Sequence, residues 1–304
     1  MKICLLLFSF LFISFYKPDD KKPFLVVLGI AQDAGYPQIG CNKDCCKKVY
    51  DKKATKQLVS CIAVVDPFSN QKWIFDATPD FPEQVKMLDT YQSGDISGIF
   101  LTHAHMGHYT GLMYLGREAM NANKTPVYAM PRMVDFIKTN GPWSQLVSLN
   151  NIELRKLKAD SVVQLNERIS VQPLLVPHRD EFSETVGYLI KCDLKSVLFI
   201  PDIDKWNKWE KDILEFIKQC DYLFLDGTFY KDEELPGRNM DEIPHPFVQE
   251  SMGLFDKLNA SEKKKISFIH FNHTNPLVRK ESNESKEVRD RGFNVASQGL
   301  VIKF

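Results

Sequence analysis

Three of the chain's seven histidines lie within six residues, in the segment Thr102–His108. The residues just before this segment are apolar and predict a strand that runs into a tight turn. Neutral imidazole nitrogens are the commonest protein ligands for zinc-like metals, and a His-x-His pair at a strand end can direct two of them at one ion. Solvated loop histidines are the alternative, but such clustering rarely arises by chance. The segment therefore predicts a metal centre built on His103, His105 and His108.

Other candidate ligands also follow strand-like runs. His178 and His270 each come directly after a short apolar run, and Asp202 ends a third. Strand ends are where the active sites of layered α/β proteins gather. We therefore expect one metal site that is assembled from several strand ends.

Length and composition indicate one large globular domain, residues 23–304. The chain has 304 residues, enough to bury a sizeable core, and it shows no linker, repeat or low-complexity segment. Its 39 basic and 39 acidic residues cancel, so nothing indicates an electrostatic grip on nucleic acid or on an anionic membrane surface. We expect a small-molecule substrate as the partner, and the sequence leaves the oligomeric state open.

Residues 1–22 form a separate segment. An almost wholly apolar run from Ile3 to Tyr16 is followed by charged residues and proline. The run is short for a transmembrane helix and has the length of the apolar part of a secretory signal peptide. We expect export, to the periplasm. An uncleaved N-terminal anchor, which would tether the chain to a membrane, and a buried first element are the alternatives.

The apolar patterns alternate between strand and helix periods. We expect strands at residues 24–28, 58–65, 73–75, 127–128, 222–225, 266–269 and 299–302, antiparallel strands within 152–190, a short helix after Gly40, and helices at 82–88, 109–121, 131–139, 206–219 and 246–258. Strand-rich halves with helices between them imply two packed sheets covered by helices.

The order of the candidate ligands resembles the motif set of the metallo-β-lactamase superfamily. That set is matched here by Asp76, His103-x-His105-x-x-His108, His178, Asp202 and His270. The resemblance implies an α/β fold of four layers, an αβ/βα sandwich of two mixed sheets flanked by helices, with a metal site at one edge.

Within the superfamily, the chain looks most like coenzyme PQQ synthesis protein B and its relatives. The similar segments are spread over nearly the whole chain after residue 23: residues 29–38, 76–81, 109–112, 226–229 and 272–276. This subgroup resemblance does not by itself imply an activity.

A second resemblance is to the phosphonate-pathway cyclic phosphodiesterases of the same superfamily. Those proteins carry a Cys-x-Cys-x-x-Cys loop and a late His-x-x-His pair that together hold a structural zinc. Cys41 and Cys46 match the outer cysteines, Cys45 is displaced, and His270-x-x-His273 matches the late pair. The comparison implies that His270 belongs to the catalytic site and that His273 completes the structural zinc site.

The thiols support that zinc independently of the resemblance. Three cysteines within six residues suit a soft, closed tetrahedral site with one imidazole. For adjacent Cys45 and Cys46 both to reach one ion, the chain must turn tightly there. A disulfide with one of the remaining cysteines, or inert buried thiols, are the alternatives. The candidate disulfide partners are Cys61, Cys192 and Cys220.

The chain departs from the superfamily motif His-x-His-x-Asp-His at Gly107. The missing aspartate normally binds the second metal. His103, His105 and His178 can still form a three-imidazole site with an open position. The second position would keep His108, Asp202 as a bridge and His270, with one charged ligand fewer and a lower affinity. We therefore expect one or two catalytic divalent ions, Zn, Mn or Fe. If there is room for the added side chain, a Gly107→Asp change is expected to strengthen the second position.

Further roles follow from the same comparison and from position. His245 matches a catalytic histidine of the cyclic phosphodiesterases and could protonate a leaving oxygen, or it could simply cap the helix that follows. Asp226, at a strand end, could orient a ligand histidine. Asp76 is expected to support the histidine-bearing loop, and Asp33 and Tyr36 to line the pocket.

Three classes of function fit these expectations. The first is a metallohydrolase in which a metal-bound hydroxide attacks a phosphodiester, ester or lactone. The second is a coenzyme PQQ synthesis protein B-like oxidoreductase or cofactor-maturation protein, with iron at the same imidazoles. The third is a metal-binding protein without turnover. Zinc or manganese with phosphodiester hydrolysis would indicate the first, and iron with oxygen uptake the second.

Overall fold

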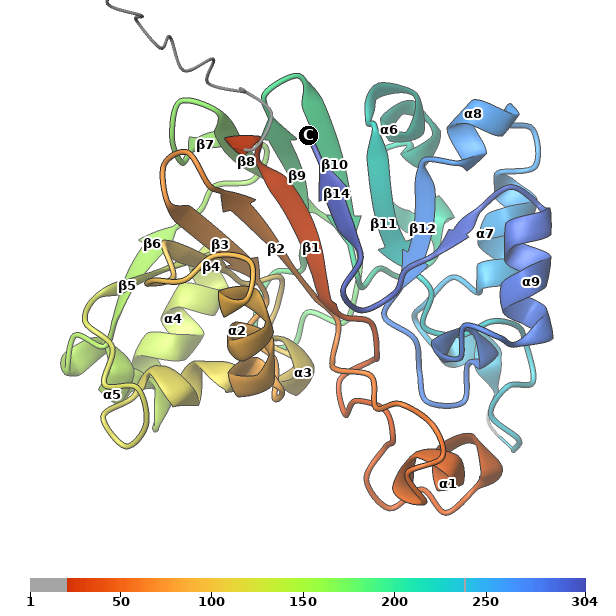
Figure 1. The fold of residues 1–304 in the computed structure, drawn as a ribbon, viewed down its shortest axis with the longest axis horizontal. Coiled ribbons are helices and arrows are strands. Elements are labelled where there is room, and N and C mark those ends of the chain that lie inside the picture. Colours follow the sequence, from red (N-terminus) through yellow and green to blue (C-terminus); the bar gives the residue numbers. More distant parts are fainter. Residues whose placement is uncertain (1–20, 238) are drawn as a thin grey trace, which may run out of the picture.

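The computed structural model describes residues 21–237 and 239–304, and two mixed β-sheets form its centre (Figure 1). The first sheet has the order β14-β1-β2-β3-β4-β5-β6. Its pairings are antiparallel from β14 to β3 and parallel from β3 to β6. The strands are β1 (Phe24–Gly29), β2 (Cys61–Asp66), β3 (Gln71–Phe75), β4 (Gly98–Phe100), β5 (Thr125–Ala129), β6 (Ile152–Lys156) and β14 (Val301–Lys303).

The second sheet has the order β13-β12-β11-β10-β9-β8-β7. It is antiparallel from β7 to β10 and parallel from β10 to β13. The strands are β7 (Val163–Gln164), β8 (Ile169–Leu175), β9 (Val186–Cys192), β10 (Lys195–Ile200), β11 (Tyr222–Asp226), β12 (Ile266–Ile269) and β13 (Asn294–Val295).

Helices cover the outer face of each sheet (Figure 1). Those on the first sheet are α2 (Phe81–Asp89), α3 (Met106–Tyr109), α4 (Pro131–Thr139) and α5 (Trp143–Ser148). Those on the second are α6 (Ile213–Gln219), α7 (Val248–Leu254), α8 (Ala260–Lys263) and α9 (Asn283–Asp290). Helix α1 (Asp44–Tyr50) projects from the body on a long loop after β1. These layers confirm the αβ/βα sandwich that the resemblance implied.

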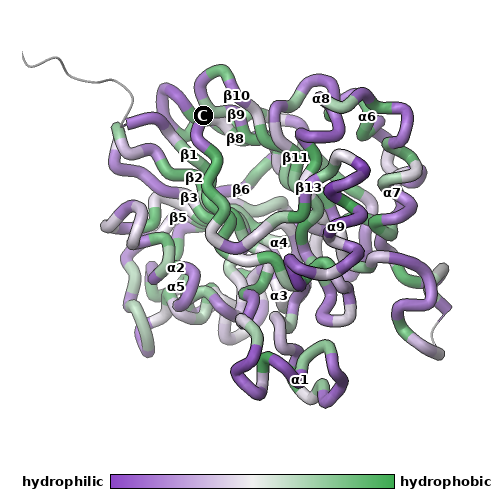
Figure 2. Tube along the Cα trace, turned by 45° about the vertical axis from the view of Figure 1, so that its right-hand side comes forward, coloured by the Kyte–Doolittle hydropathy of each residue, from purple (hydrophilic) through white to green (hydrophobic). Residues whose placement is uncertain are grey.

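Strand periodicity explains why the sheets stack. In β3, Trp73 and Phe75 point into the core between the sheets, whereas Ile74 points to the helices on the other face. The Phe75 ring lies 5.4 Å, centroid to centroid, from that of Tyr188 in the second sheet. Apolar segments accordingly gather in the strands, and hydrophilic segments lie on the outer helices and loops (Figure 2). Both faces of β1, β2 and β11 are buried, which is why their sequences are almost continuously apolar.

Several expected elements differ in extent. The helix expected at 109–121 is instead α3 followed by a 3₁₀ helix, η2 (Thr110–Leu115). Gly111 explains the change, because it packs directly on the backbone of Thr78, where an added Cβ would lie 2.2 Å from the carbonyl oxygen. The helix expected at 206–219 is divided into η3 (Trp206–Lys208) and α6, and Asp212 caps α6 through the backbone N–H of Leu214.

Two further expectations are corrected. The residues from 152 to 190 do not form one antiparallel set, since β6 joins the first sheet as a parallel edge strand. The helix expected at 246–258 spans only Val248–Leu254.

The predicted N-terminal signal or anchor, residues 1–22, lies outside the described residues except for its last two. The division into this segment and a domain at 23–304 therefore stays a prediction. No helix within residues 21–237 and 239–304 has the length and apolarity needed to cross a membrane.

Candidate metal centre

The loops that follow several strands bring the predicted histidines together. His103, His105 and His178 form one group, with one potential ligand atom of each lying within 4.8 Å of the others. The ring centroids of His103 and His105 are 4.3 Å apart, and that of His178 is 5.1 Å from His105. The first two follow β4, and His178 follows β8 of the other sheet. The three-imidazole set expected from the sequence is thus assembled across the two sheets.

Asp202 lies between this group and a second one. Its Oδ2 is 3.0 Å from Nε2 of His108 and 3.2 Å from Nε2 of His270, and its Oδ1 is 3.9 Å from Nε2 of His178. Asp202 is buried and follows β10. This is the position that a bridging carboxylate between two ions needs.

An aspartate and a threonine orient the histidines of the first sheet. Buried Asp76 accepts hydrogen bonds from Nδ1 of His108, at 2.7 Å, and from the hydroxyl of Thr102, at 3.0 Å. Since the Thr102 proton is directed at Asp76, its oxygen accepts from Nδ1 of His103, 2.9 Å away. Both rings are therefore held through Nδ1, which leaves each Nε2 free to face the centre. Asp76 supports the loop, as expected.

The second sheet repeats this arrangement. Buried Asp226 accepts hydrogen bonds from Nδ1 of His245, at 2.8 Å, and from the hydroxyl of Thr228, at 2.7 Å. The Thr228 oxygen lies 3.0 Å from Nδ1 of His270. Asp226 thus orients His245 directly and His270 through Thr228. His245 is buried, and Phe247, not His245, occupies the N-cap of α7, so the alternative of a capping histidine does not hold.

The central atoms are buried without hydrogen-bond partners in the described part of the chain. They are Nε2 of His103, His108 and His270, both ring nitrogens of His178, Oδ2 of Asp202 and Oδ1 of Asp33. Leaving a buried donor or acceptor unpaired costs about 1–3 kcal/mol each. Lone pairs that converge in this way suit divalent cations, so these residues fit the metal that the motif implies.

The charges of the two groups differ. Burial holds the pKa of His103 well below its ordinary value and lowers that of His178 to about 4, so both rings are neutral and can bind metal. Burial also opposes the charged form of His108, but Asp76 and Asp202 outweigh it and raise the pKa well above the ordinary value. For Asp202, burial is outweighed by His270 and His108, which hold its pKa well below the usual range.

A residue that we placed only in the pocket lining belongs to the second group. Asp33 lies on the loop after β1, and its Oδ1 is 3.2 Å from Nε2 of His108 and 3.9 Å from Nε2 of His270. These three residues form a potential metal-binding group. Asp33 thus places a further carboxylate beside His108 and His270, where the sequence predicted one charged ligand fewer. The feature of the sequence that could have indicated this role is an acidic residue in the loop after the first strand.

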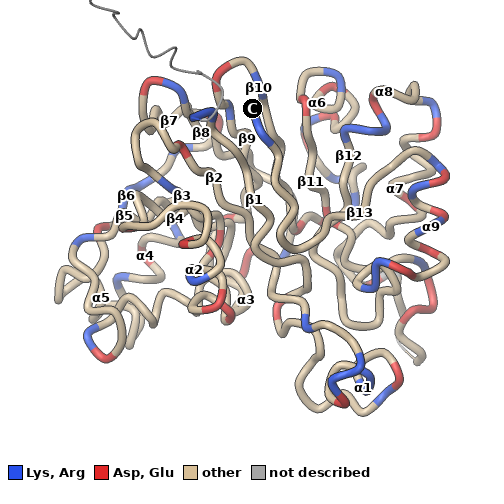
Figure 3. The backbone as a smooth tube through the Cα atoms, viewed as in Figure 1, with Lys and Arg blue, Asp and Glu red and all other residues tan. Residues whose placement is uncertain are grey.

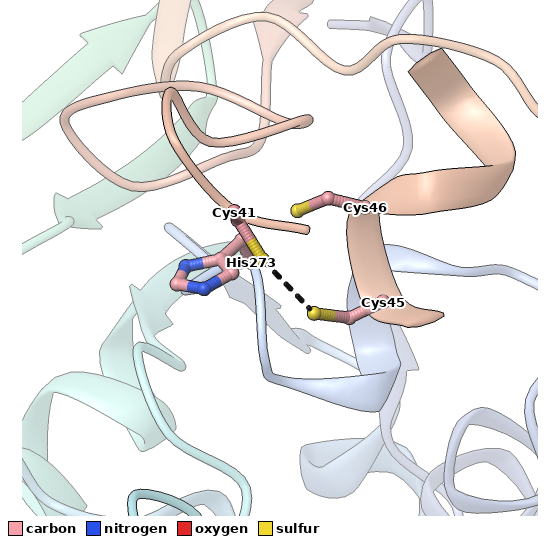
Figure 4. Close-up of side chains that lie close together, drawn as sticks. All are labelled: Cys41, Cys45, Cys46 and His273. Atoms are coloured by element: carbon pink, nitrogen blue, oxygen red, sulfur yellow. Dashed lines mark hydrogen bonds between the residues drawn. The ribbon is translucent and has the colours of Figure 1, made fainter. Parts of the chain in front are cut away.

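The cysteines form a separate cluster with His273 (Figure 4). Their potential ligand atoms lie within 4.8 Å of one another, and the sulfurs of Cys41 and Cys45 are 3.6 Å apart. Helix α1 provides the turn that the sequence required, since Cys45 and Cys46 lie in its first turn. Burial raises the pKa of the Cys46 thiol to about 12.

Among the described residues, the other cysteines do not pair with this cluster. All six cysteines that the structure describes carry free thiols, and Cys61, Cys192 and Cys220 are buried. The disulfide alternative therefore has no support among the described residues.

Two loops carry parts of both metal-binding regions. The segment between β1 and β2, which includes α1, contains Asp33 and the three clustered cysteines, and the loop after β12 contains His270 and His273. They are joined by a hydrogen bond from the N–H of Gln32 to the carbonyl of Phe271, at 2.8 Å, and by one from the Asn272 amide to the Gln32 side chain, at 2.7 Å.

A model of the beta-lactamase superfamily domain matches residues 72–271, so the chain belongs to this superfamily. Coenzyme PQQ synthesis protein B from Methylobacillus flagellatus is 29% identical over 311 residues, covering 91% of this chain and 98% of that protein. The same protein from Acinetobacter baylyi is 26% identical over 308 residues, covering 91% and 98%.

Solved structures share the fold. Zn²⁺-bound PqqB from Methylobacterium extorquens superimposes with a TM-score of 0.78 at 22% identity, covering 92% of this chain and 100% of that one. A diphosphatase from the PhnP family gives a TM-score of 0.65 at 22% identity, covering 93% and 97%. The comparisons confirm both the superfamily and the subgroup resemblance, and they support divalent-metal binding and an enzymatic role.

Proposed function

We propose that the protein is a metal-dependent hydrolase that acts on a phosphodiester, ester or lactone. The observation that carries this proposal is the convergence of His103, His105 and His178 beside the bridging carboxylate of Asp202. A divalent ion held there lowers the pKa of water enough to supply a hydroxide nucleophile near neutral pH, and it stabilises the developing negative charge. Histidines that follow strands of both sheets have buried ring nitrogens without hydrogen-bond partners among the described residues, and these nitrogens are available to bind the ion.

His245 is proposed as the proton donor to the leaving oxygen. Its ring centroid is 5.2 Å from that of His178 and 6.4 Å from that of His270, so it borders both ligand groups. Burial opposes its charged form, but Asp226 outweighs this and raises its pKa, which keeps a proton available near neutral pH. Asp226 acts here as a positioning residue.

The ions proposed are one structural zinc and one or two catalytic divalent ions. Three thiols and one imidazole form the closed, soft site that structural zinc prefers, with Cys41, Cys45, Cys46 and His273 as ligands. The catalytic ligands are imidazoles and carboxylates, which suit Zn, Mn or Fe. The Zn²⁺ named in the PqqB structure supports zinc, and the PhnP-family diphosphatase supports a substrate that contains phosphate.

The second candidate is a PqqB-like iron-dependent oxidoreductase or cofactor-maturation protein. The observation that favours it is similarity to coenzyme PQQ synthesis protein B along 91% of the chain. A metal-binding protein without turnover is the third candidate. From the sequence alone, we also propose that the chain is exported and that it binds a small-molecule substrate. Cell fractionation tests the export.

Metal-resolved assays separate these candidates. The metal-free protein is loaded with zinc, with manganese or, in the absence of oxygen, with iron. Each form is assayed for hydrolysis of bis(p-nitrophenyl) phosphate, a p-nitrophenyl ester and an aromatic lactone. Oxygen uptake is measured separately. We expect hydrolysis with zinc or manganese that is lost in His105→Ala. Oxygen uptake by the iron form without hydrolysis would replace the proposal with the second candidate, and inactivity of all forms would favour the third.

A further inference from the structure

Asp33 lies against Gly107 and fills the space that a side chain at position 107 would need. A Cβ added to Gly107 would lie 2.2 Å from Oδ1 of Asp33 and 2.5 Å from its Cα. Gly107 is the position at which the superfamily motif has an aspartate. In this chain, the carboxylate of a distant loop residue fills the place that the side chain at 107 would enter.

The Asp33 carboxylate faces the imidazoles of His108 and His270, beside which the motif aspartate would lie. The side chain is 39% exposed, yet its Oδ1 is buried and has no hydrogen-bond partner in the described part of the chain. That oxygen faces Nε2 of His108 and of His270, and both nitrogens are also buried without a hydrogen-bond partner there. A carboxylate oxygen and two imidazole nitrogens therefore converge on one point.

The backbone holds Asp33 in this place. Ala31 pairs with both Val59 and Phe271, and Gly35 closes a turn on the carbonyl of Gln32, with a positive φ of 74°. The loop is thus fixed on both sides of Asp33 and approaches α3 closely. Only a residue without a side chain at 107 permits that approach.

We propose that Asp33 is a ligand of the second catalytic metal ion and replaces the missing motif aspartate from another part of the chain. This inference rests on the proposed metal centre. With Asp33, the second position has two imidazoles, from His108 and His270, and two carboxylates, one shared through Asp202. The two negative charges balance one divalent cation, so Gly107 does not mark an abandoned site.

Three variants test Asp33 as a ligand: Asp33→Asn, Gly107→Asp, and Asp95→Asn as a control. Asp95 is exposed, in the loop between α2 and β4. Each protein is loaded with Mn²⁺ after its cysteine cluster has been filled with Zn²⁺. Metal content is measured by elemental analysis, and spin coupling between two close Mn²⁺ ions by electron paramagnetic resonance.

Wild type and Asp95→Asn are expected to show a coupled pair. Asp33→Asn should weaken the second ion at least about tenfold and abolish the coupling, while one catalytic ion remains. Gly107→Asp should also lose the pair, because a Cβ at 107 would lie 2.5 Å from the Cα of Asp33 and would displace the loop that carries it.

Each contrary result has a distinct meaning. Asp33→Asn with a wild-type coupled pair would overturn the proposal. A wild-type protein that binds no ion beyond the cysteine cluster would instead contradict the proposed function. Thermal melting of each metal-free variant identifies any that fail to fold, and the isosteric Asn variant keeps the test decisive if Gly107→Asp is one of them.

Discussion

Nδ1 of His245 donates a hydrogen bond to the buried carboxylate of Asp226 over 2.8 Å. Removal of this imidazole, in His245→Ala, is expected to lower kcat about 10²–10⁴-fold for substrates with a basic leaving group. The loss should be small for p-nitrophenolate, which leaves without a proton. Steady-state kinetics on a series of aryl phosphodiesters checks this through the slope of log kcat against leaving-group pKa. An equal loss across the series would contradict the role of proton donor.

Asp226→Asn tests the positioning role separately. The amide keeps the shape but supplies less negative charge to His245, so its proton should be lost at lower pH. We expect about a 10–100-fold fall in kcat, with the alkaline limb of the pH–rate profile moved to lower pH and the metal content retained. A profile that keeps the wild-type limb would show that the effect is only structural.

Cys41→Ser should remove one zinc per chain and leave the imidazole-bound ions in place. A hydroxyl is a poor zinc ligand, and the remaining thiols and imidazole cannot close the tetrahedron. Elemental analysis measures the loss. Cys220→Ser is the matched control, because this thiol is buried outside the cluster and its change should leave the zinc content as in wild type. Equal zinc contents of the two variants would contradict the assignment.

Zinc binding at the cysteine cluster should release protons. Burial raises the pKa of Cys46 to about 12 and also raises that of Cys45, so both thiols are protonated in the metal-free protein near neutral pH. Because zinc binds thiolates, its apparent affinity should increase as pH rises. Calorimetric titration in buffers with different heats of ionisation counts the protons released. A heat that does not depend on the buffer would exclude thiolate ligation.

Gly111→Ala should destabilise the fold by about 1–3 kcal/mol, since the added Cβ would press on the Thr78 carbonyl, 2.2 Å away. Gly253→Ala is the control, because it lies within α7 with no atom within 4 Å of the added Cβ. There the methyl group should raise the free energy of unfolding by about 0.5–1 kcal/mol. Urea unfolding of the zinc-loaded proteins measures both. Equal shifts would show that the packing of Gly111 on Thr78 carries no special cost.

The sequence was most informative where a potential metal ligand follows a short apolar run. His103, His178, Asp202 and His270 each follow a strand, and strands of packed sheets deliver such residues to a common edge. Asp33 gave no comparable signal, because its irregular loop carries no periodicity to show which side chain turns inward. Its place depends on a contact with Gly107, which is distant in sequence.

The pairing of strands within the sheets was harder to predict than the strands themselves. The alternation at residues 152–156 correctly indicated a strand, but side-chain periodicity does not tell which sheet a strand joins. The packing of Gly111 on Thr78 similarly interrupts a segment whose local pattern favours a longer helix.

The shared loops link the thiol cluster to the imidazole centre. Residues 33 and 41–46 belong to the segment between β1 and β2, and residues 270 and 273 to the loop after β12. The hydrogen bond between Gln32 and Phe271 joins the two. An ion bound in either cluster would therefore restrain the ligands of its neighbour, and by thermodynamic reciprocity each ion would then tighten the binding of the other. Oxidation of the three sulfurs would in this way weaken metal binding at the proposed imidazole centre without altering any of its own side chains.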